Sequence, residues 1–196
     1  MSSVRTLTFA DAALPHAGVL RDVALVVAAS LVTALAARVA IPVPWSPVPL
    51  TGQTFAVLLT GAMLGARRAL LAQVLYLAEG AAGLPVFAGG LAGPLVFAGP
   101  SAGYLFSFPL AAAATGTLAE RGWDRRFATT LAAMLAGSAV ILVSGAAVLT
   151  RFVPESRVLT AGVLPFLPGD LVKAVSAALV LPGAWRVLRR RDGSGA

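Results

Sequence analysis

The sequence predicts an all-α integral membrane protein with six transmembrane helices and with both termini in the cytoplasm. Of its 196 residues, 58% are hydrophobic and 12% are charged, and the mean hydropathy is +0.88. An ordinary soluble domain has about 25% charged residues. The length favours one domain. We therefore expect a cytoplasmic segment at 1–19, a six-helix membrane domain at 20–188 and a basic cytoplasmic tail at 189–196.

Apolar runs between charged or Pro/Gly breaks locate the helices. The expected helices cover approximately 20–40, 52–65, 68–83, 101–119, 127–150 and 168–188. The second and third are shorter than the roughly 20 residues of an upright span, so they are expected to be broken or to continue into irregular backbone that lines a cavity. The first run could be a signal peptide, but its removal would reverse the charge pattern, so an uncleaved helix is favoured.

Basic residues are unevenly distributed between the expected loops. With the N-terminus in the cytoplasm, that side holds 11 of the 15 basic residues. They are Arg5, Arg21, Arg67, Arg68, Arg121, Arg125, Arg126, Arg186, Arg189, Arg190 and Arg191. Only Arg38, Arg151 and Arg157 fall near the other side. Because cytoplasmic loops of membrane proteins are enriched in Lys and Arg, the net charge of +7 indicates topology and not nucleic-acid binding.

Two charged residues, Asp170 and Lys173, stand one helical turn apart at the start of the last apolar run. Each costs about 2.5–3.5 kcal/mol near the centre of a membrane helix, so a pair on one helix face indicates a polar pocket. We predict that a small polar molecule binds there. The helix dipole disfavours a cation in the first turn, so Lys173 needs an anionic partner: Asp170, Glu79 or the ligand.

Three connections on the predicted outer side have unusual compositions. Residues 41–50 contain four prolines and are expected to form a stiff extended segment. Residues 83–100 carry no charge and are rich in Gly and Pro, which predicts a lid folded back onto the helix ends. Residues 151–168 lead into the Pro-Gly turn before Asp170. Together they predict a capped pocket on the outer face.

Several kinds of chemistry are disfavoured by the residues that are absent. There is no cysteine, and His16, the single histidine, precedes the first span, so neither a thiolate nor a histidine base is expected in the membrane. No catalytic residue and no metal site is predicted. Lys173, the single lysine, is followed by Ala174, so the chain lacks a phosphate-binding Gly-Lys-Ser/Thr loop. An intramembrane enzyme using Glu79 and Asp170 is conceivable, yet no nucleophile is evident. The chain is therefore not expected to act as an ATP-driven motor of that kind.

Motifs in several parts of the chain together resemble the BioY family, in family order from about residue 20 to 188. The motifs are Ile41-Pro42-Val43-Pro44, Pro47-Val48-Pro49-Leu50-Thr51-Gly52-Gln53-Thr54, Gly65-Ala66-Arg67-Arg68, Gly83-Leu84-Pro85-Val86-Phe87-Ala88-Gly89-Gly90, Gly99-Pro100-Ser101-Ala102-Gly103-Tyr104 and Pro165-Phe166-Leu167-Pro168-Gly169-Asp170-Leu171-Val172-Lys173.

The resemblance implies the fold of the substrate-binding (S) component of energy-coupling-factor (ECF) ABC transporters, in a prokaryotic cell membrane. It implies that biotin is bound with high affinity from outside, as a transported ligand and without a cofactor. The partners would be a transmembrane coupling protein (T component) and two cytoplasmic ATPases. A capture subunit for another vitamin or small metabolite on the same scaffold is the alternative.

The resemblance also suggests roles for individual residues. Asp170 can accept hydrogen bonds from the ureido N–H groups of biotin, and Lys173 can donate to its ureido oxygen or carboxylate. Tyr104 and Trp45 can pack against the apolar rings. Glu79 and Gln53 are further candidates for ligand contact. Gly89, Gly90 and Gly103 would let the backbone approach the ligand.

Each of these residues also has a structural interpretation. Asp170 could be a helix cap, and Lys173 could extend outward to the membrane surface. Tyr104 and Trp45 could belong to an interfacial aromatic belt. Gln53 could bond across helices, and Glu79 could pair with Arg38 or Lys173.

The chain departs from the BioY pattern in the lid. Many members have a polar or charged residue where Leu91-Ala92-Gly93 stands, and some have a basic residue where Leu105 stands. We therefore expect that a lid contact to the ligand is missing or is made by the backbone.

Overall fold

The computed structural model describes residues 7–14 and 18–193, with side chains as far as Leu188. Arg5 and His16 lie outside the described residues, as do the side chains of Arg189, Arg190 and Arg191. The protein is mainly helical, and every predicted range contains a helix. The long helices are α2 (Val19–Ala36), α3 (Gln53–Leu64), α4 (Ala66–Ala81), α5 (Ala102–Ala119), α6 (Phe127–Leu149) and α8 (Leu167–Gly193). The expected class, helical with several apolar helices, is confirmed.

Within the described ranges, four segments are long and apolar enough to cross a membrane. They are Val19–Ala36, Ala102–Ala119, Phe127–Leu149 and Glu155–Leu188. The helix Gln53–Leu64 is apolar but shorter. As the sequence indicated, the second and third long helices, α3 and α4, are the short ones.

Some elements were not predicted. The short helices are α1 (Phe9–Ala13) and α7 (Glu155–Gly162), and the 3-10 turns are η1 (Ala88–Gly90), η2 (Pro94–Ala98) and η3 (Trp123–Arg125). The proline segment forms a two-stranded antiparallel sheet, β1 (Ala40–Ile41) with β2 (Leu50–Thr51), in which Ala40 lies opposite Thr51. This hairpin replaces the single extended segment that the prolines suggested, because residues on both sides of the prolines remain free to pair.

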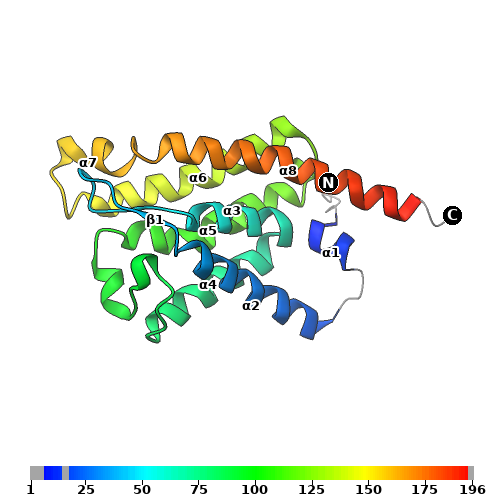
Figure 1. Ribbon diagram of the computed structural model, residues 1–196, viewed down its shortest axis with the longest axis horizontal. Helices are drawn as coiled ribbons and strands as arrows, with labels where there is room; N and C mark the ends of the chain where they lie inside the picture. Colours follow the sequence, from blue (N-terminus) through cyan, green and yellow to red (C-terminus); the bar gives the residue numbers. More distant parts are fainter. Residues whose placement is uncertain (1–6, 15–17, 194–196) are drawn as a thin grey trace, which may run out of the picture.

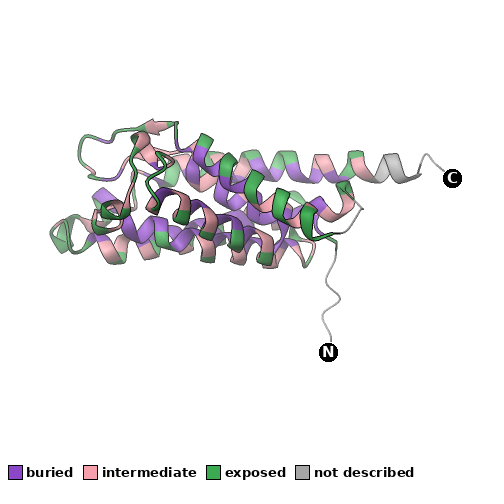
Figure 2. Cartoon of the chain, turned by 90° about the horizontal axis from the view of Figure 1, so that it is seen from below, coloured by how far each residue is buried: buried purple, intermediate pink, exposed green. Residues whose placement is uncertain are grey.

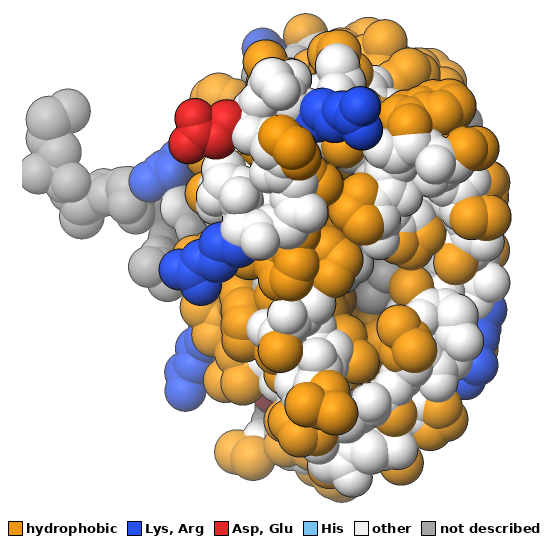
Figure 3. All heavy atoms as spheres, turned by 90° about the vertical axis from the view of Figure 1, so that its left-hand side faces the viewer, with side chains coloured by type: hydrophobic (Ala, Val, Ile, Leu, Met, Phe, Trp, Pro, Cys, Tyr) orange, Lys and Arg blue, Asp and Glu red, His pale blue; other side chains and the backbone are white. Residues whose placement is uncertain are grey.

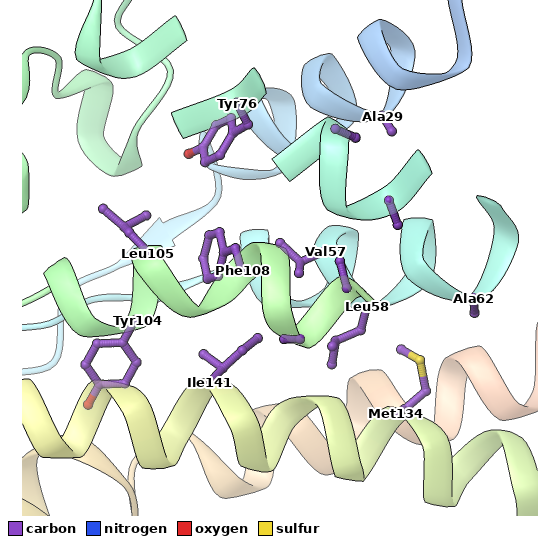
Figure 4. Close-up of a cluster of buried hydrophobic side chains, with 14 of the residues drawn as sticks. Ala29, Val57, Leu58, Ala62, Tyr76, Tyr104, Leu105, Phe108, Met134 and Ile141 are labelled. Atoms are coloured by element: carbon purple, nitrogen blue, oxygen red, sulfur yellow. The ribbon is translucent and has the colours of Figure 1, made fainter. Parts of the chain in front are cut away.

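The core of the bundle lies around α5, which packs against α3, α4 and α6 (Figure 1). Small residues allow this close packing. A Cβ at Gly61 would lie 2.7 Å from the carbonyl oxygen of Ala112, so a larger residue on α3 would push α5 away. Figure 2 shows the buried residues along the inner faces of the helices. In Figure 4, Val57 of α3, Phe108 of α5 and Ile141 of α6 converge in this core.

The two ends of the bundle differ in composition. At one end α1 packs on α8, where the rings of Phe9 and Trp185 meet edge to face at 5.6 Å, and the guanidinium of Arg125 lies 4.5 Å from the centre of the Trp185 ring. At the opposite end lie α7 and β1 (Figure 1). We call these the arginine end and the pocket end. The arginines that sequence analysis assigned to the cytoplasm and whose contacts are described, among them Arg21 and Arg68, meet at the first of these ends.

Candidate ligand-binding site

A cavity of approximately 490 Å³ lies at the pocket end of the bundle. It is lined by the hairpin, by the 83–100 segment, and by residues of α3, α5, α6 and α8. Figure 3 views this end from outside and shows that hydrophobic side chains cover much of it while charged side chains are few. Most of the lining is apolar, so its few polar groups must fix the orientation of any ligand.

Asp170 and Lys173 both line this cavity. Asp170 is 7% exposed. Its Oδ2 accepts a hydrogen bond from the Ser138 hydroxyl of α6, and its Oδ1 lies 3.3 Å from the Lys173 ammonium. A carboxylate with two such partners can remain charged in an apolar bundle. Asp170, and not Glu79, is therefore the anionic partner of Lys173 in this structure.

Lys173 also donates to two oxygens at the start of α3. Its Nζ lies 3.0 Å from the carbonyl oxygen of Thr51 and 2.7 Å from the Thr54 hydroxyl oxygen. With the Asp170 contact, the three ammonium protons each have a protein acceptor. The lysine consequently joins α8 to the hairpin and to α3.

The Pro-Gly turn determines where Asp170 points. α8 begins at Leu167, so Pro168 stands in the first turn, where its missing N–H has no cost. The Asp170 N–H bonds the Phe166 carbonyl at 2.9 Å. Asp170 and Lys173 then share one face of α8, three residues apart, as the sequence predicted.

Tyr104 lines the cavity with its ring and uses its hydroxyl elsewhere. The hydroxyl donates to the Gly162 carbonyl at the end of α7, at 2.7 Å, and the ring lies 5.7 Å from the Phe166 ring. A Cβ at Gly145 of α6 would lie 2.2 Å from the Tyr104 ring, so this glycine creates the space that the ring occupies. Tyr104 is thus a buried wall of the cavity and not part of an interfacial belt.

Gln53 also lines the cavity and at the same time joins helices. Its amide donates to the Tyr76 hydroxyl of α4, which in turn donates to the Val86 carbonyl at 3.0 Å. This chain of hydrogen bonds links α3, α4 and the 83–100 segment. The expectation that Gln53 bonds across helices agrees with this geometry.

The 83–100 segment folds over the cavity, as predicted for a lid. Phe87 is buried, and a Cβ at Gly80 would lie 2.0 Å from the Phe87 ring. The Gly93 N–H bonds the Gly80 carbonyl at 2.8 Å, and Arg38 donates to the Pro85 carbonyl at 2.9 Å. The lid is therefore fastened to the C-terminal ends of α2 and α4. The lid residues that line the cavity have apolar side chains or, at Gly99, none. They are Phe87, Ala88, Leu91, Ala92, Leu95, Val96, Gly99 and Pro100.

Two of the predicted polar or aromatic contacts lie outside this lining. Glu79 accepts a hydrogen bond from the Ser30 hydroxyl of α2 at 2.5 Å. Trp45, in the turn of the hairpin, is 67% exposed. Contact between either residue and a ligand stays a prediction.

The three predicted glycines also lie outside the lining. Gly89 and Gly90 have φ angles of 69° and 78°, which residues with a Cβ rarely adopt, so these glycines shape the lid backbone. Gly103 faces α6, where a Cβ would lie 2.5 Å from the Ser144 carbonyl oxygen. The structure gives all three a role in folding, and their approach to a ligand stays a prediction.

Sequence reasoning missed the residues that hold the charged pair. Ser138 lies in the middle of α6, far from Asp170 in sequence, and nothing distinguishes it from other helical serines. Thr51 and Thr54 belong to a motif quoted above but were not singled out. The one sequence signal that could have indicated Thr54 was its position next to Gln53, which was a predicted site residue. Among the described residues, no group of three or more His, Cys, Asp or Glu side chains could hold a metal ion.

Comparison with known proteins decides the family. Residues 5–190 match the protein family described as "BioY family". This chain belongs to the BioY family. Its BioY relatives include the "Biotin transporter BioY" of Thermotoga maritima, 41% identical over 141 residues, which cover 71% of this chain and 82% of the relative.

Two further comparisons extend the BioY match. The "Probable biotin transporter BioY" of Pyrococcus horikoshii is 37% identical over 160 residues, covering 82% of this chain and 93% of that protein. The crystal structure of "the S-component for biotin from an ECF-type ABC transporter" superposes with a TM-score of 0.74 at 23% identity, covering 85% of this chain and 92% of that one. That likeness shows a shared fold.

Proposed function

We propose that this BioY-family protein binds biotin with high affinity on the outer side of the cell membrane, as the substrate-specific subunit of an ECF-type ABC transporter. The observation that carries the proposal is the pair of buried Asp170 and half-buried Lys173 on the wall of a largely apolar cavity. The names of its relatives, all biotin transporters, support the same ligand. They also support a transport role and not an enzymatic one.

The pair matches the polar edge of biotin. A cyclic urea presents an N–H donor and a carbonyl oxygen side by side. Asp170 and Lys173 bond each other at 3.3 Å, and one edge of the ureido ring can replace this contact, with Asp170 accepting from the N–H and Lys173 donating to the oxygen. The rings of Tyr104, Phe108 and Phe166 line the rest of the cavity and suit the thioether ring and aliphatic chain. The cavity volume falls within the roughly 300–1,000 Å³ of small-molecule sites.

We further propose that all six long helices cross the cell membrane, with both termini in the cytoplasm. Charge distribution supports this orientation, because the arginine end would face the cytoplasm and the cavity would open outward. The chain has no cysteine, so single cysteines introduced by mutation can report the orientation. In intact cells, an impermeant thiol reagent should label Trp45→Cys and should not label Arg126→Cys until the cells are opened. The reverse pattern would refute the orientation.

The proposed partners are a T component and two cytoplasmic ATPases. The absence of a Gly-Lys-Ser/Thr loop means that this chain supplies no ATP-binding lysine of that kind. Reconstituted with those partners, the protein should take up labelled biotin only when ATP is supplied. ATP-independent uptake of equal rate by the isolated chain would contradict this part of the proposal.

Biotin binding itself is tested by calorimetry on the protein purified in detergent. We expect affinity in the micromolar range or tighter, with a large loss on Asp170→Ala or Lys173→Ala. A panel of biotin, riboflavin, thiamine and folate tests the alternative of another vitamin on the same scaffold. Preference for one of the others, or unchanged biotin affinity in both variants, would overturn the assignment.

A further inference from the structure

The Thr54 hydroxyl accepts a hydrogen bond from Lys173 and keeps its own proton unused. The Lys173 Nζ lies 2.7 Å from the Thr54 oxygen. Within the part of the chain that the structure describes, the Thr54 hydroxyl donates no hydrogen bond. Since a hydroxyl has one proton to donate, that proton is available to a ligand.

The local fold explains why this proton is unused. Hydroxyls inside helices commonly donate to the carbonyl one turn earlier, as Thr60 does to Ala56 and Thr117 does to Ala113. Thr54 stands at the second position of α3, and the residue four positions earlier, Leu50, belongs to β2. The helical acceptor is missing, while the Thr54 side chain lines the cavity.

Ser138 provides a contrast at the same site. Its hydroxyl donates to Asp170 Oδ2, so its proton is already committed to the protein. Asp170 can therefore only accept hydrogen bonds from a ligand, whereas Thr54 can donate one. The ammonium of Lys173 polarises the Thr54 hydroxyl and makes it a stronger donor.

We propose that Thr54 is a ligand-contact residue that donates its hydroxyl proton to the ureido oxygen of bound biotin, beside Lys173. This inference rests on the proposed function. It adds a requirement for selectivity. A ligand must present a hydrogen-bond acceptor for Thr54 next to the N–H group that donates to Asp170. A ligand without that acceptor would leave the Thr54 proton unpaired in an apolar cavity, which is unfavourable.

Calorimetry with biotin on three variants tests the role of the hydroxyl. Thr54→Val keeps the side-chain shape and removes the hydroxyl, both its proton and the oxygen that accepts from Lys173, and we expect about tenfold or greater loss of affinity. Thr54→Ser keeps the proton, and we expect affinity within about threefold of the parent. Thr117→Val is the matched control, because it removes a helical hydroxyl outside the cavity, and it should bind as the parent does. Parental affinity in Thr54→Val would overturn the inference.

A structure of the parent protein with biotin separates direct contact from an effect through Lys173. We expect the Thr54 oxygen within hydrogen-bond distance of the ureido oxygen. A ureido oxygen out of reach of Thr54 would refute direct contact even if Thr54→Val binds weakly or folds poorly. If the parent binds no biotin, the proposed function fails; if the parent binds and these two outcomes are negative, only this inference fails.

Discussion

The two ends of the bundle hold their charged side chains in different ways. At the arginine end, Asp11 of α1 bonds Arg21 at 2.9 Å and Arg68 at 2.7 Å, and Arg68 also pairs with Asp22 at 2.9 Å. These side chains remain partly exposed and pair with one another. On the wall of the cavity at the pocket end, Asp170 and Lys173 pair with each other and with the neutral groups of Ser138, Thr51 and Thr54.

This difference shows which charges can serve a ligand. Partly exposed ion pairs contribute little energy each, about 0–1 kcal/mol. A buried pair is costly unless its hydrogen bonds are completed. Asp170 can accept further hydrogen bonds, the Thr54 hydroxyl keeps an unused proton, and both residues line the cavity. The comparison therefore predicts that binding depends on the pocket end and that stability alone depends on the charges at the arginine end.

The largest effect is expected for Asp170→Asn. The change removes the carboxylate that accepts from Ser138 and Lys173 and leaves the ammonium without an anion. Truncating one partner of a buried, hydrogen-bonded charge pair costs about 2–5 kcal/mol, so biotin affinity measured by calorimetry should fall roughly 30-fold or more.

The matched control is Asp22→Asn, which makes the same chemical change at the arginine end, where the Asp22 side chain is 46% exposed. Biotin affinity in this variant should stay within about twofold of the parent. Equal losses in the two variants would remove the distinction between the ends.

A second effect is expected when the lid is displaced without any change of charge. In Gly80→Ala, the new methyl group would overlap the Phe87 ring, which must move, and Phe87 lines the cavity. We expect about tenfold faster release of biotin, measured by stopped-flow or by exchange of labelled ligand, because most changes in affinity occur in the dissociation rate.

Gly183→Ala is the control for this change, since a Cβ at Gly183 on α8 would meet nothing within 4 Å. Its release rate should equal that of the parent. If Gly80→Ala also releases biotin at the rate of the parent, the position of the Phe87 ring does not control the lid.

The helices and the charged pair could be predicted from the sequence because their signals are local. Apolar runs define helix positions, and scarcity of charge makes Asp170 and Lys173 conspicuous. Their spacing of three residues already places them on one face. The lid was predictable too, since an uncharged segment rich in Gly and Pro such as 83–100 is neither freely solvated nor able to form a regular α-helix.

The remaining parts of the site depend on contacts between distant segments. Ser138 reaches Asp170 because α6 packs beside α8, and no local pattern encodes that contact. Glycines have several uses that sequence does not separate: Gly89 provides a positive φ, whereas Gly103 provides close helix packing. The hairpin was missed because strands of two residues are too short for a pattern of alternation to be recognised.

A smaller effect, on stability, is expected for Asp11→Asn at the arginine end. Burial raises the pKa of Asp11, but hydrogen bonds from Thr8, Arg68 and Arg21 outweigh it and hold the pKa below its ordinary value of 3.8. A carboxyl with a lowered pKa stabilises the folded state above its unfolded pKa and loses this contribution as the pH falls through the folded value.

The variant should therefore melt about 2–4 °C lower than the parent at pH 6, and the difference should shrink in acid below pH 3.8. Thermal unfolding in detergent at the two pH values measures this. Biotin affinity at pH 6 should be unchanged, and a loss at that pH would contradict the separation of the two ends.

The smallest effect is expected for Trp45→Ala, within the pocket end itself. Its neighbours Pro47, Val48 and Pro49 line the cavity, but Trp45 is 67% exposed and lies outside the lining. Side chains that do not contact the ligand contribute little to affinity, so calorimetry should give a change of about twofold or less. A tenfold loss would mean that the hairpin rearranges to bring this ring onto the ligand. The boundary of the binding region would then extend beyond the cavity wall, and the buried pair would share control of affinity with an exposed aromatic ring.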